Sequence, residues 1–160
     1  MDITWVTERV GVGGGIWTDE KMLECIRAGV THVVNMQLEW DDRGLCEPYG
    51  VKVEWCATDD DFCRKPPELF ERGVGFAMKA LEDPEAKVFI HCAAGVHRAP
   101  MMTLAVLMAC GFELEEAMRV IQTRRPVVDF APVYVNSVED WWEGRESEKG
   151  AEDVEEVRGD

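Results

Sequence analysis

Positive charge is scarce in this sequence: 17 Lys and Arg residues stand against 32 Asp and Glu, a formal net charge of −15 over 160 residues. Such a balance argues against a general binder of nucleic acids or anionic membranes. The six cysteines include no C-x-x-C pair and no spacing typical of a zinc site. No apolar run approaches the roughly 20 residues that span a bilayer, and no signal peptide opens the chain. We therefore expect a cytoplasmic protein with reduced cysteines.

Length and composition predict one domain with a sizeable core, because 46% of the residues are hydrophobic. We expect this domain to span residues 1–142. Residues 143–160 are polar, acidic and without an apolar stripe, so we predict a disordered tail that carries much of the acidic excess. The glycine run at 13–15 is not followed by the G-K-[ST] of a nucleotide-binding loop, and it predicts a turn before a helix.

Hydrophobic periodicity predicts strands that alternate with helices. The opening residues read as a strand or hairpin at a sheet edge, and residues 39–47 read as a polar connection. Strands joined through helices favour an α/β fold with a small parallel-rich sheet flanked by helices, and a ligand beyond the carboxyl ends of the strands. The predicted strands lie within 3–12, 30–36, 51–55 and 87–91, and the predicted helices cover 18–28, 67–82, 101–110, 113–123 and 134–142.

One stretch, residues 88–100, combines a strand, a tight loop and the start of a helix. The apolar run ends at His91 and Cys92, and five residues separate Cys92 from Arg98. A loop of this kind directs main-chain N–H groups and a helix N-terminus toward one anion. The same dipoles stabilise a cysteine thiolate, the form of the thiol that attacks phosphorus. The stretch therefore predicts a phosphate-binding loop with Cys92 as its nucleophile.

The other residues of this loop suit the same chemistry. The planar fork of Arg98 can hold two phosphate oxygens at once. Gly95 can adopt a backbone angle that is closed to residues with a Cβ. His91 ends the strand, and we expect it to orient the loop through a hydrogen bond rather than to act as an acid or base. The predicted phosphate-binding residues are Ala93, Ala94, Gly95, Val96, His97 and Arg98.

These residues read H-C-x-x-G-x-x-R, and the chain resembles the cysteine-dependent protein phosphatases, in particular a small, atypical dual-specificity phosphatase. The passage Gly29 to Asn35, a glycine followed by a strand that ends in asparagine, looks like the same family. The resemblance implies a single-domain protein-tyrosine-phosphatase-like fold. It also implies hydrolysis of phosphotyrosine or of phosphoserine and phosphothreonine in proteins, through a phosphocysteine intermediate.

A departing alkoxide or phenoxide needs a proton, which a carboxylic acid on a neighbouring loop can donate. Three adjacent aspartates, Asp59, Asp60 and Asp61, lie on a strand-to-helix loop before the phosphate-binding loop. The acid of the resembled family lies on that loop at about this distance from the cysteine. Counting without gaps selects Asp60, while a one-residue shift of the loop would select Asp59 or Asp61.

Two positions depart from the resembled pattern. Ala99 stands where most relatives carry a serine or threonine that helps the cysteine sulfur leave, so hydrolysis of the phosphocysteine is expected to be slow or to rely on water. His97 precedes the arginine, should line the mouth of the pocket, and would change its contact with anions near neutral pH. A histidine without a role remains an alternative there. Ala99 also keeps open a phosphate-binding pseudophosphatase.

The partners expected from this reading are a phosphorylated protein substrate and phosphate- or sulfate-type anions in the loop, with no nucleic acid, membrane, metal or cofactor. A monomer is the default. Glucan or phosphoinositide substrates are alternatives, since some starch and glycogen-type phosphatases carry a similar Ala-Pro after the arginine. A redox sensor, in which Cys92 forms a disulfide with another cysteine, is a further alternative.

Overall fold

A computed structural model gives the fold, with helices and strands described for residues 1–158 and side chains for residues 1–147. The sheet has five strands in the order β1-β2-β5-β3-β4. All neighbouring pairs are parallel except β1 and β2, which form a hairpin at one edge. The predicted parallel-rich sheet is confirmed. The strands are β1 (Ile3–Trp5), β2 (Val10–Gly13), β3 (His32–Gln37), β4 (Lys52–Thr58) and β5 (Val88–His91).

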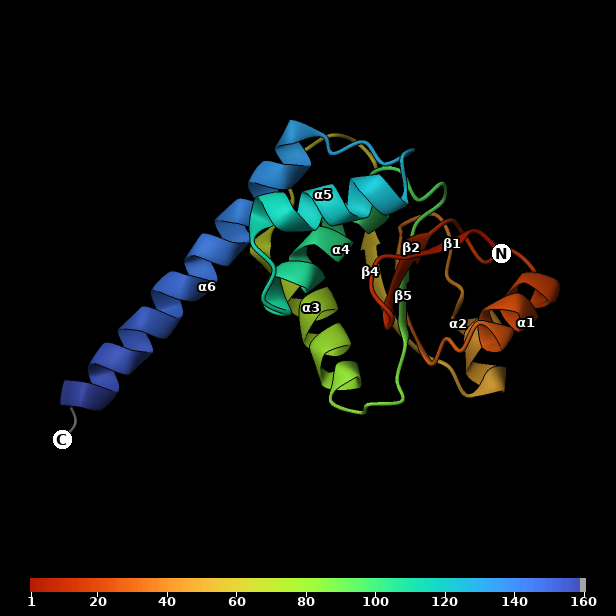
Figure 1. Ribbon diagram of the computed structural model, residues 1–160, viewed down its shortest axis with the longest axis horizontal. Coiled ribbons are helices and arrows are strands. Elements are labelled where there is room, and N and C mark those ends of the chain that lie inside the picture. Colours follow the sequence, from red (N-terminus) through yellow and green to blue (C-terminus); the bar gives the residue numbers. More distant parts are fainter. Residues whose placement is uncertain (159–160) are drawn as a thin grey trace.

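Helices cover both faces of this sheet, as period-two alternation along the strands requires. Val34 and Ile90 belong to the larger buried cluster, which packs under four helices, whereas Val33 and Phe89 belong to a smaller cluster under two helices. The first face carries α3 (Pro67–Leu81), α4 (Arg98–Ala109), α5 (Leu114–Arg124) and α6 (Pro132–Arg158), and the second carries α1 (Asp19–Arg27) and α2 (Arg43–Cys46) (Figure 1).

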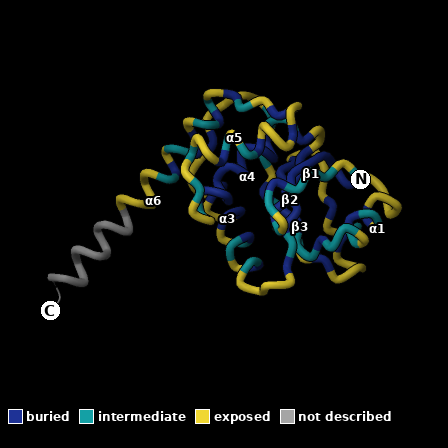
Figure 2. Tube along the Cα trace, viewed as in Figure 1, coloured by how far each residue is buried: buried dark blue, intermediate teal, exposed yellow. Residues whose placement is uncertain are grey.

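Helix α4 lies at the centre of the larger layer. Every residue from Arg98 to Met108 is buried, and Figure 2 shows this helix in dark blue between α3 and α5. A helix with apolar residues on all its faces is surrounded by other elements of the fold. Because α4 starts directly after the predicted phosphate-binding loop, its burial fixes the position of that loop at the carboxyl end of β5.

The structure differs from the sequence prediction in two segments. The polar connection at 39–47 contains α2 and begins a short 3₁₀ helix, η1 (Glu47–Tyr49), which have too few residues to give a periodic pattern. The tail predicted to be disordered instead continues α6 to Arg158, and residues 159–160 lie outside the described part. Glutamate is the most frequent residue there and favours helix, a propensity that acidity and the lack of an apolar stripe conceal. The domain boundary at 142 stays a prediction. Within the described residues, no helix combines the length and apolarity needed to cross a bilayer.

Candidate active site

The loop between β5 and α4 encloses the sulfur of Cys92. The thiol is 3% exposed, and the Gly95 N–H donates to its Sγ at 3.3 Å. Four other main-chain N–H groups of the loop donate to no acceptor among the described residues. A thiol surrounded by uncommitted donors is a site for an anion. These four groups belong to Ala93, Ala94, Val96 and His97.

Gly95 occupies a position that only glycine fits. Its φ of +68° lies in the left-handed region, and a Cβ there would stand 2.6 Å from the main-chain carbon of Gly13. The glycine run at 13–15 lies directly behind the loop, since Gly15 N–H donates to the Ala93 carbonyl at 3.1 Å and Gly13 accepts from the Cys92 N–H at 3.3 Å. The run predicted as a simple turn is therefore also part of the support of the loop.

Arg125, at the end of α5, holds the loop from its other side. Its Nε donates to the Gly95 carbonyl at 2.9 Å and its Nη2 to the Ala94 carbonyl at 3.1 Å. The remaining contacts of the buried guanidinium go to Asp2, at 2.7 and 2.8 Å, and to Thr4 at 3.0 Å. The hydrogen bond from Arg125 lowers the pKa of Asp2. One side chain thus ties the phosphate-binding loop to the first strand of the sheet.

Arg98 begins α4 with its side chain 5% exposed. Glu39, in the loop after β3, accepts from its Nη1 at 2.6 Å and its Nη2 at 3.1 Å, and the Thr58 carbonyl accepts from Nη1 at 2.9 Å. The hydrogen bond from Arg98 lowers the pKa of Glu39. Burial opposes the charge of Arg98, but Glu39, Cys92 and Asp60 outweigh it, so the pKa of Arg98 is raised.

The contacts of Arg98 leave one edge of its guanidinium unused. A guanidinium has five N–H donors, and Glu39 and Thr58 use three of them. The buried Nε has no partner among the described residues. The Nε–H and the second Nη2–H point in the same direction, which is the geometry that holds two oxygens of one phosphate. The fork predicted for Arg98 is therefore available on this edge.

His91 is fully buried at the end of β5, where its Nε2 lies 2.6 Å from Asp42 Oδ2. Asp42 also accepts from the Asn35 amide at 3.2 Å, and the other ring nitrogen of His91 lies 3.4 Å from the Cys92 carbonyl. The Phe89 ring stacks on the imidazole, with 5.4 Å between centroids. His91 thus connects the loop to the segment after β3, and its orienting role stays a prediction.

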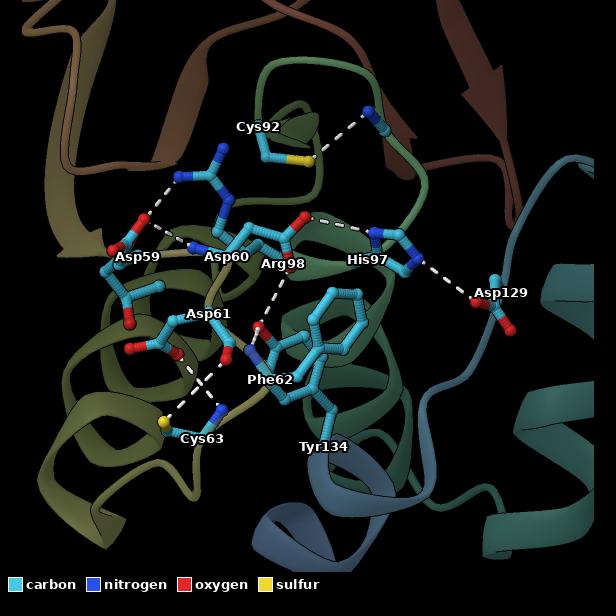
Figure 3. A network of polar contacts seen from close by, with 12 residues as sticks. Asp59, Asp60, Asp61, Phe62, Cys63, Cys92, His97, Arg98, Asp129 and Tyr134 are labelled. Carbon is cyan, nitrogen blue, oxygen red and sulfur yellow. Dashed lines mark hydrogen bonds and ion pairs between the residues drawn. The ribbon is translucent and has the colours of Figure 1, made fainter.

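The three aspartates after β4 point in different directions (Figure 3). Asp60 approaches the phosphate-binding loop: its Oδ2 lies 3.0 Å from His97 Nδ1, and its Oδ1 accepts from the Tyr134 hydroxyl at 2.9 Å. Asp61 accepts from the Lys65 ammonium at 2.8 Å, and that hydrogen bond lowers its pKa. Asp59 accepts from the N–H of Asp60 at 2.9 Å. Only Asp60, among these three, contacts a residue of the predicted loop through its side chain.

Ala99 is fully buried in the first turn of α4 and carries no hydroxyl toward the sulfur. The next hydroxyl along the helix, that of Thr103, donates to the Ala99 carbonyl at 2.8 Å. It therefore does not replace the missing group. All six cysteines are free, and the described residues contain no cluster of three or more His, Cys, Asp or Glu side chains suited to a metal ion.

Several residues of the site were not found from the sequence. They come from four separate segments, and each is an ordinary polar residue in its own neighbourhood. Only Arg125 left a signal, since it directly precedes Pro126 at the end of a predicted helix. The residues that the sequence did not place at the site are Glu39, Asp42, Arg125, Asp129 and Tyr134.

Comparison with known folds agrees with this geometry. A crystal structure of PTPMT1 superposes with a TM-score of 0.79 at 21% identity, covering 93% of this chain and 99% of that one. A crystal structure of human DUSP28 gives 0.77 at 19% identity, covering 91% of this chain and 96% of that one. At these identities the likeness establishes the fold alone, and it confirms the predicted protein-tyrosine-phosphatase-like architecture.

Sequence comparison identifies the family. The chain is 32% identical to dual specificity protein phosphatase 26 of Rattus norvegicus over 110 residues, which cover 66% of this chain and 51% of that protein. It is 30% identical to protein tyrosine phosphatase type IVA 2 of Mus musculus over 104 residues, 64% of this chain and 61% of that protein. The chain thus matches about half to three-fifths of the length of these relatives. The family model described as dual specificity phosphatase, catalytic domain, matches residues 18–142. The chain belongs to the dual specificity phosphatase family.

Proposed function

We propose that the chain is a phosphoric monoester hydrolase that transfers the phosphoryl group to Cys92 and then to water. The observation that carries this proposal is one loop in which the Cys92 sulfur, uncommitted main-chain N–H groups and the free edge of Arg98 surround the same space. These groups supply positive potential where phosphate carries negative charge, so the mechanism requires no metal ion or cofactor. A reducing compartment such as the cytoplasm would keep the thiolate available.

The first step is an in-line attack of the Cys92 thiolate on phosphorus. The S–P bond forms while the bond to the leaving oxygen breaks, and Arg98 and the loop amides bind the equatorial oxygens. Asp60 donates a proton to the leaving oxygen and then, as a carboxylate, takes one from the attacking water as the S–P bond breaks. Asp60 is the best candidate of the three aspartates because its carboxylate alone approaches the loop, while Lys65 holds Asp61 away from it.

A phosphorylated protein with one phosphate at the site is the substrate class that we favour. Carboxylates stand around the loop, including those of Glu39 and Asp129, whose side chains are 51% and 68% exposed. Such a rim disfavours a ligand with several phosphates and favours a phosphorylated residue with neutral or basic neighbours. PTPMT1 has been crystallised in complex with PI(5)P, so phosphoinositides are the alternative that a substrate assay should include.

A second candidate function is a phosphate-binding module with little turnover. The observation that favours it is Ala99, because no hydroxyl next to the sulfur assists its departure from phosphorus. The first step would then proceed normally while the phosphocysteine accumulates. The two functions therefore differ in the second step only.

A burst experiment with p-nitrophenyl phosphate tests both functions. Steady release of nitrophenolate supports the phosphatase, one equivalent followed by a stall supports the binding module, and no release contradicts both. Cys92→Ser should abolish release and retain binding of tungstate or phosphate, whereas Cys63→Ser, at an exposed cysteine, should release nitrophenolate normally. Turnover by Cys92→Ser would exclude Cys92 as the nucleophile.

The acid is tested by substitutions at two neighbouring aspartates. Asp60→Asn should lower kcat by about 10²–10⁴-fold for an alkyl or phenyl phosphate, which needs a proton on the leaving oxygen. The loss should be much smaller for p-nitrophenyl phosphate, whose leaving group is stable as an anion. Asp61→Asn serves as the control. Equal losses in both variants would remove Asp60 from the mechanism.

A further inference from the structure

His97 lies between two carboxylates that come from different segments (Figure 3). Its Nδ1 is 3.0 Å from Asp60 Oδ2, and its Nε2 is 3.1 Å from Asp129 Oδ2 in the loop before α6. The N–H of Asp129 also donates to the Val96 carbonyl at 3.0 Å, so the main chain fixes this approach. The imidazole is 22% exposed, and the edge-to-face ring of Phe62, 5.0 Å away, covers part of it.

The two contacts of His97 require a particular number of protons. Each nitrogen-to-oxygen contact at hydrogen-bond distance needs one hydrogen between its atoms. A neutral imidazole has one N–H, and a carboxylate has none. Both contacts therefore hold only if the three groups together carry one proton more than a neutral imidazole beside two carboxylates. Without that proton, a nitrogen lone pair would face a carboxylate oxygen.

Tyr134 cannot supply this extra proton. Its hydroxyl donates to Asp60 Oδ1 at 2.9 Å, and its oxygen accepts from the Phe62 N–H at 3.1 Å. Burial, with Asp60 as a further cause, raises the pKa of Tyr134 to about 12, so the hydroxyl keeps its proton at neutral pH. The proton must lie within the set Asp60, His97 and Asp129. Other charged groups near this set include Arg98, with Glu39 and Cys92 beside it, and Asp61 and Lys65 on the loop of Asp60.

We propose that His97, held by Asp129, is a positioning residue that keeps the catalytic proton on or beside Asp60. The inference rests on the proposed function, in which Asp60 is the general acid. In the first step the proton between Asp60 Oδ2 and His97 Nδ1 moves to the leaving oxygen as the P–O bond breaks. In the second step the attacking water gives a proton to Asp60 as the S–P bond breaks, which restores the contact. No proton is gained or lost over the cycle.

The proposal has a consequence for the dependence of activity on pH. Turnover that needs the acid should fall as pH rises, once the set loses its extra proton. His97→Asn removes the ring that holds the proton beside Asp60, and Asp129→Asn removes one of the two charges that stabilise the proton. Both variants should lose the proton that Asp60 donates at a lower pH than the wild type does.

The test is the pH profile of kcat/KM for phenyl phosphate and for p-nitrophenyl phosphate. For phenyl phosphate, we expect the alkaline limb, the decline of kcat/KM at high pH, to begin at a pH about 1–2 units lower in His97→Asn than in the wild type. The shift should be smaller in Asp129→Asn. The limb for p-nitrophenyl phosphate should move little. His32→Asn, at a histidine at the start of β3, is the control and should leave both limbs in place.

The outcomes separate the inference from the proposed function. If Asp60→Asn selectively lowers turnover of phenyl phosphate but neither His97→Asn nor Asp129→Asn moves the limb, the inference is wrong and the acid stands. If Asp60→Asn lowers turnover of phenyl phosphate and of p-nitrophenyl phosphate by the same factor, the assignment of Asp60 as the acid is wrong. A uniform loss of kcat at every pH in the histidine variant would indicate a purely structural role and would also overturn the inference.

Discussion

Arg125→Lys should weaken the fold and the phosphate-binding loop together. The guanidinium makes five hydrogen bonds, two of them to the carbonyls of Ala94 and Gly95 and three to Asp2 and Thr4. Lysine presents its donors from a single nitrogen and lacks the planar fork. It can keep a contact with Asp2, but it cannot reach the loop carbonyls at the same time. We therefore expect those two carbonyls to lose their partner.

The size of this effect follows from the burial of the groups involved. A buried acceptor left without a partner costs about 1–3 kcal/mol. Gly95 is buried, whereas Ala94 is exposed and water can reach its carbonyl. The Asp2 side chain is 58% exposed, so its ion pair contributes below about 1 kcal/mol. The free energy of unfolding should therefore fall by about 1–3 kcal/mol, mainly from the Gly95 carbonyl.

Urea denaturation at pH 7 measures this loss, and kcat/KM for an aryl phosphate measures the effect on the loop. Arg124→Lys is the matched control, because Arg124 precedes Arg125 in the chain and is exposed. We expect kcat/KM to fall at least about tenfold in the Arg125 variant, because a displaced loop no longer orients its N–H groups and Cys92 toward the phosphate. Unfolding free energies within about 0.5 kcal/mol of each other in the two variants would refute the reasoning.

Three further predictions concern the same site and the core around it. Gly95→Ala should lower stability by at least about 1–2 kcal/mol and reduce aryl phosphatase activity, because a left-handed φ and a blocked Cβ both oppose alanine; an active, stable variant would contradict the φ of +68°. In a Tyr49→Phe background, the absorbance of the Tyr134 phenolate should appear near pH 12; this pKa is raised above the ordinary 10, so its contribution to stability is complete below pH 10 and is lost toward pH 12. Iodoacetamide at pH 7 should alkylate Cys92 and the exposed Cys63 but spare Cys56, whose pKa burial raises to about 12; mass mapping that finds Cys56 alkylated in the folded protein would contradict its burial.

The sequence was sufficient wherever the signal is local. The alternation of strands and helices follows from periodicity. The loop from Cys92 to Arg98 is one continuous segment whose residue types and spacing already imply its shape. The loop proposed to carry the acid also has a local signal, because it follows a strand and precedes a helix. Counting along the chain selects Asp60 but leaves Asp59 and Asp61 open, and only the fold distinguishes them, since the directions of their side chains depend on Lys65 and Tyr134.

The residues that complete the site could not be predicted, because they are far from it in sequence. Glu39 is 59 residues from Arg98, Asp42 is 49 residues from His91, and Arg125 is 30 residues from Gly95. Neither Glu39 nor Asp42 interrupts a hydrophobic pattern or forms a motif with its neighbours, and Arg125 is marked only by the proline that follows it. The roles of Glu39 and Asp42 arise only when the parallel sheet brings the carboxyl ends of β3, β4 and β5 to one edge, and that of Arg125 only when the end of α5 reaches the loop.

The acidity of the chain is compatible with an anion site because the nearby carboxylates are bound to donors. Glu39 is paired with Arg98, Asp42 contacts His91, and Asp60 accepts from Tyr134. Surface charges farther away than about 8 Å are largely screened at physiological ionic strength. What a phosphate meets is therefore the local field of the loop amides, the start of α4 and one arginine edge. Net charge describes the surface of this protein, whereas affinity for phosphate depends on a few oriented donors that no count of Lys and Arg detects.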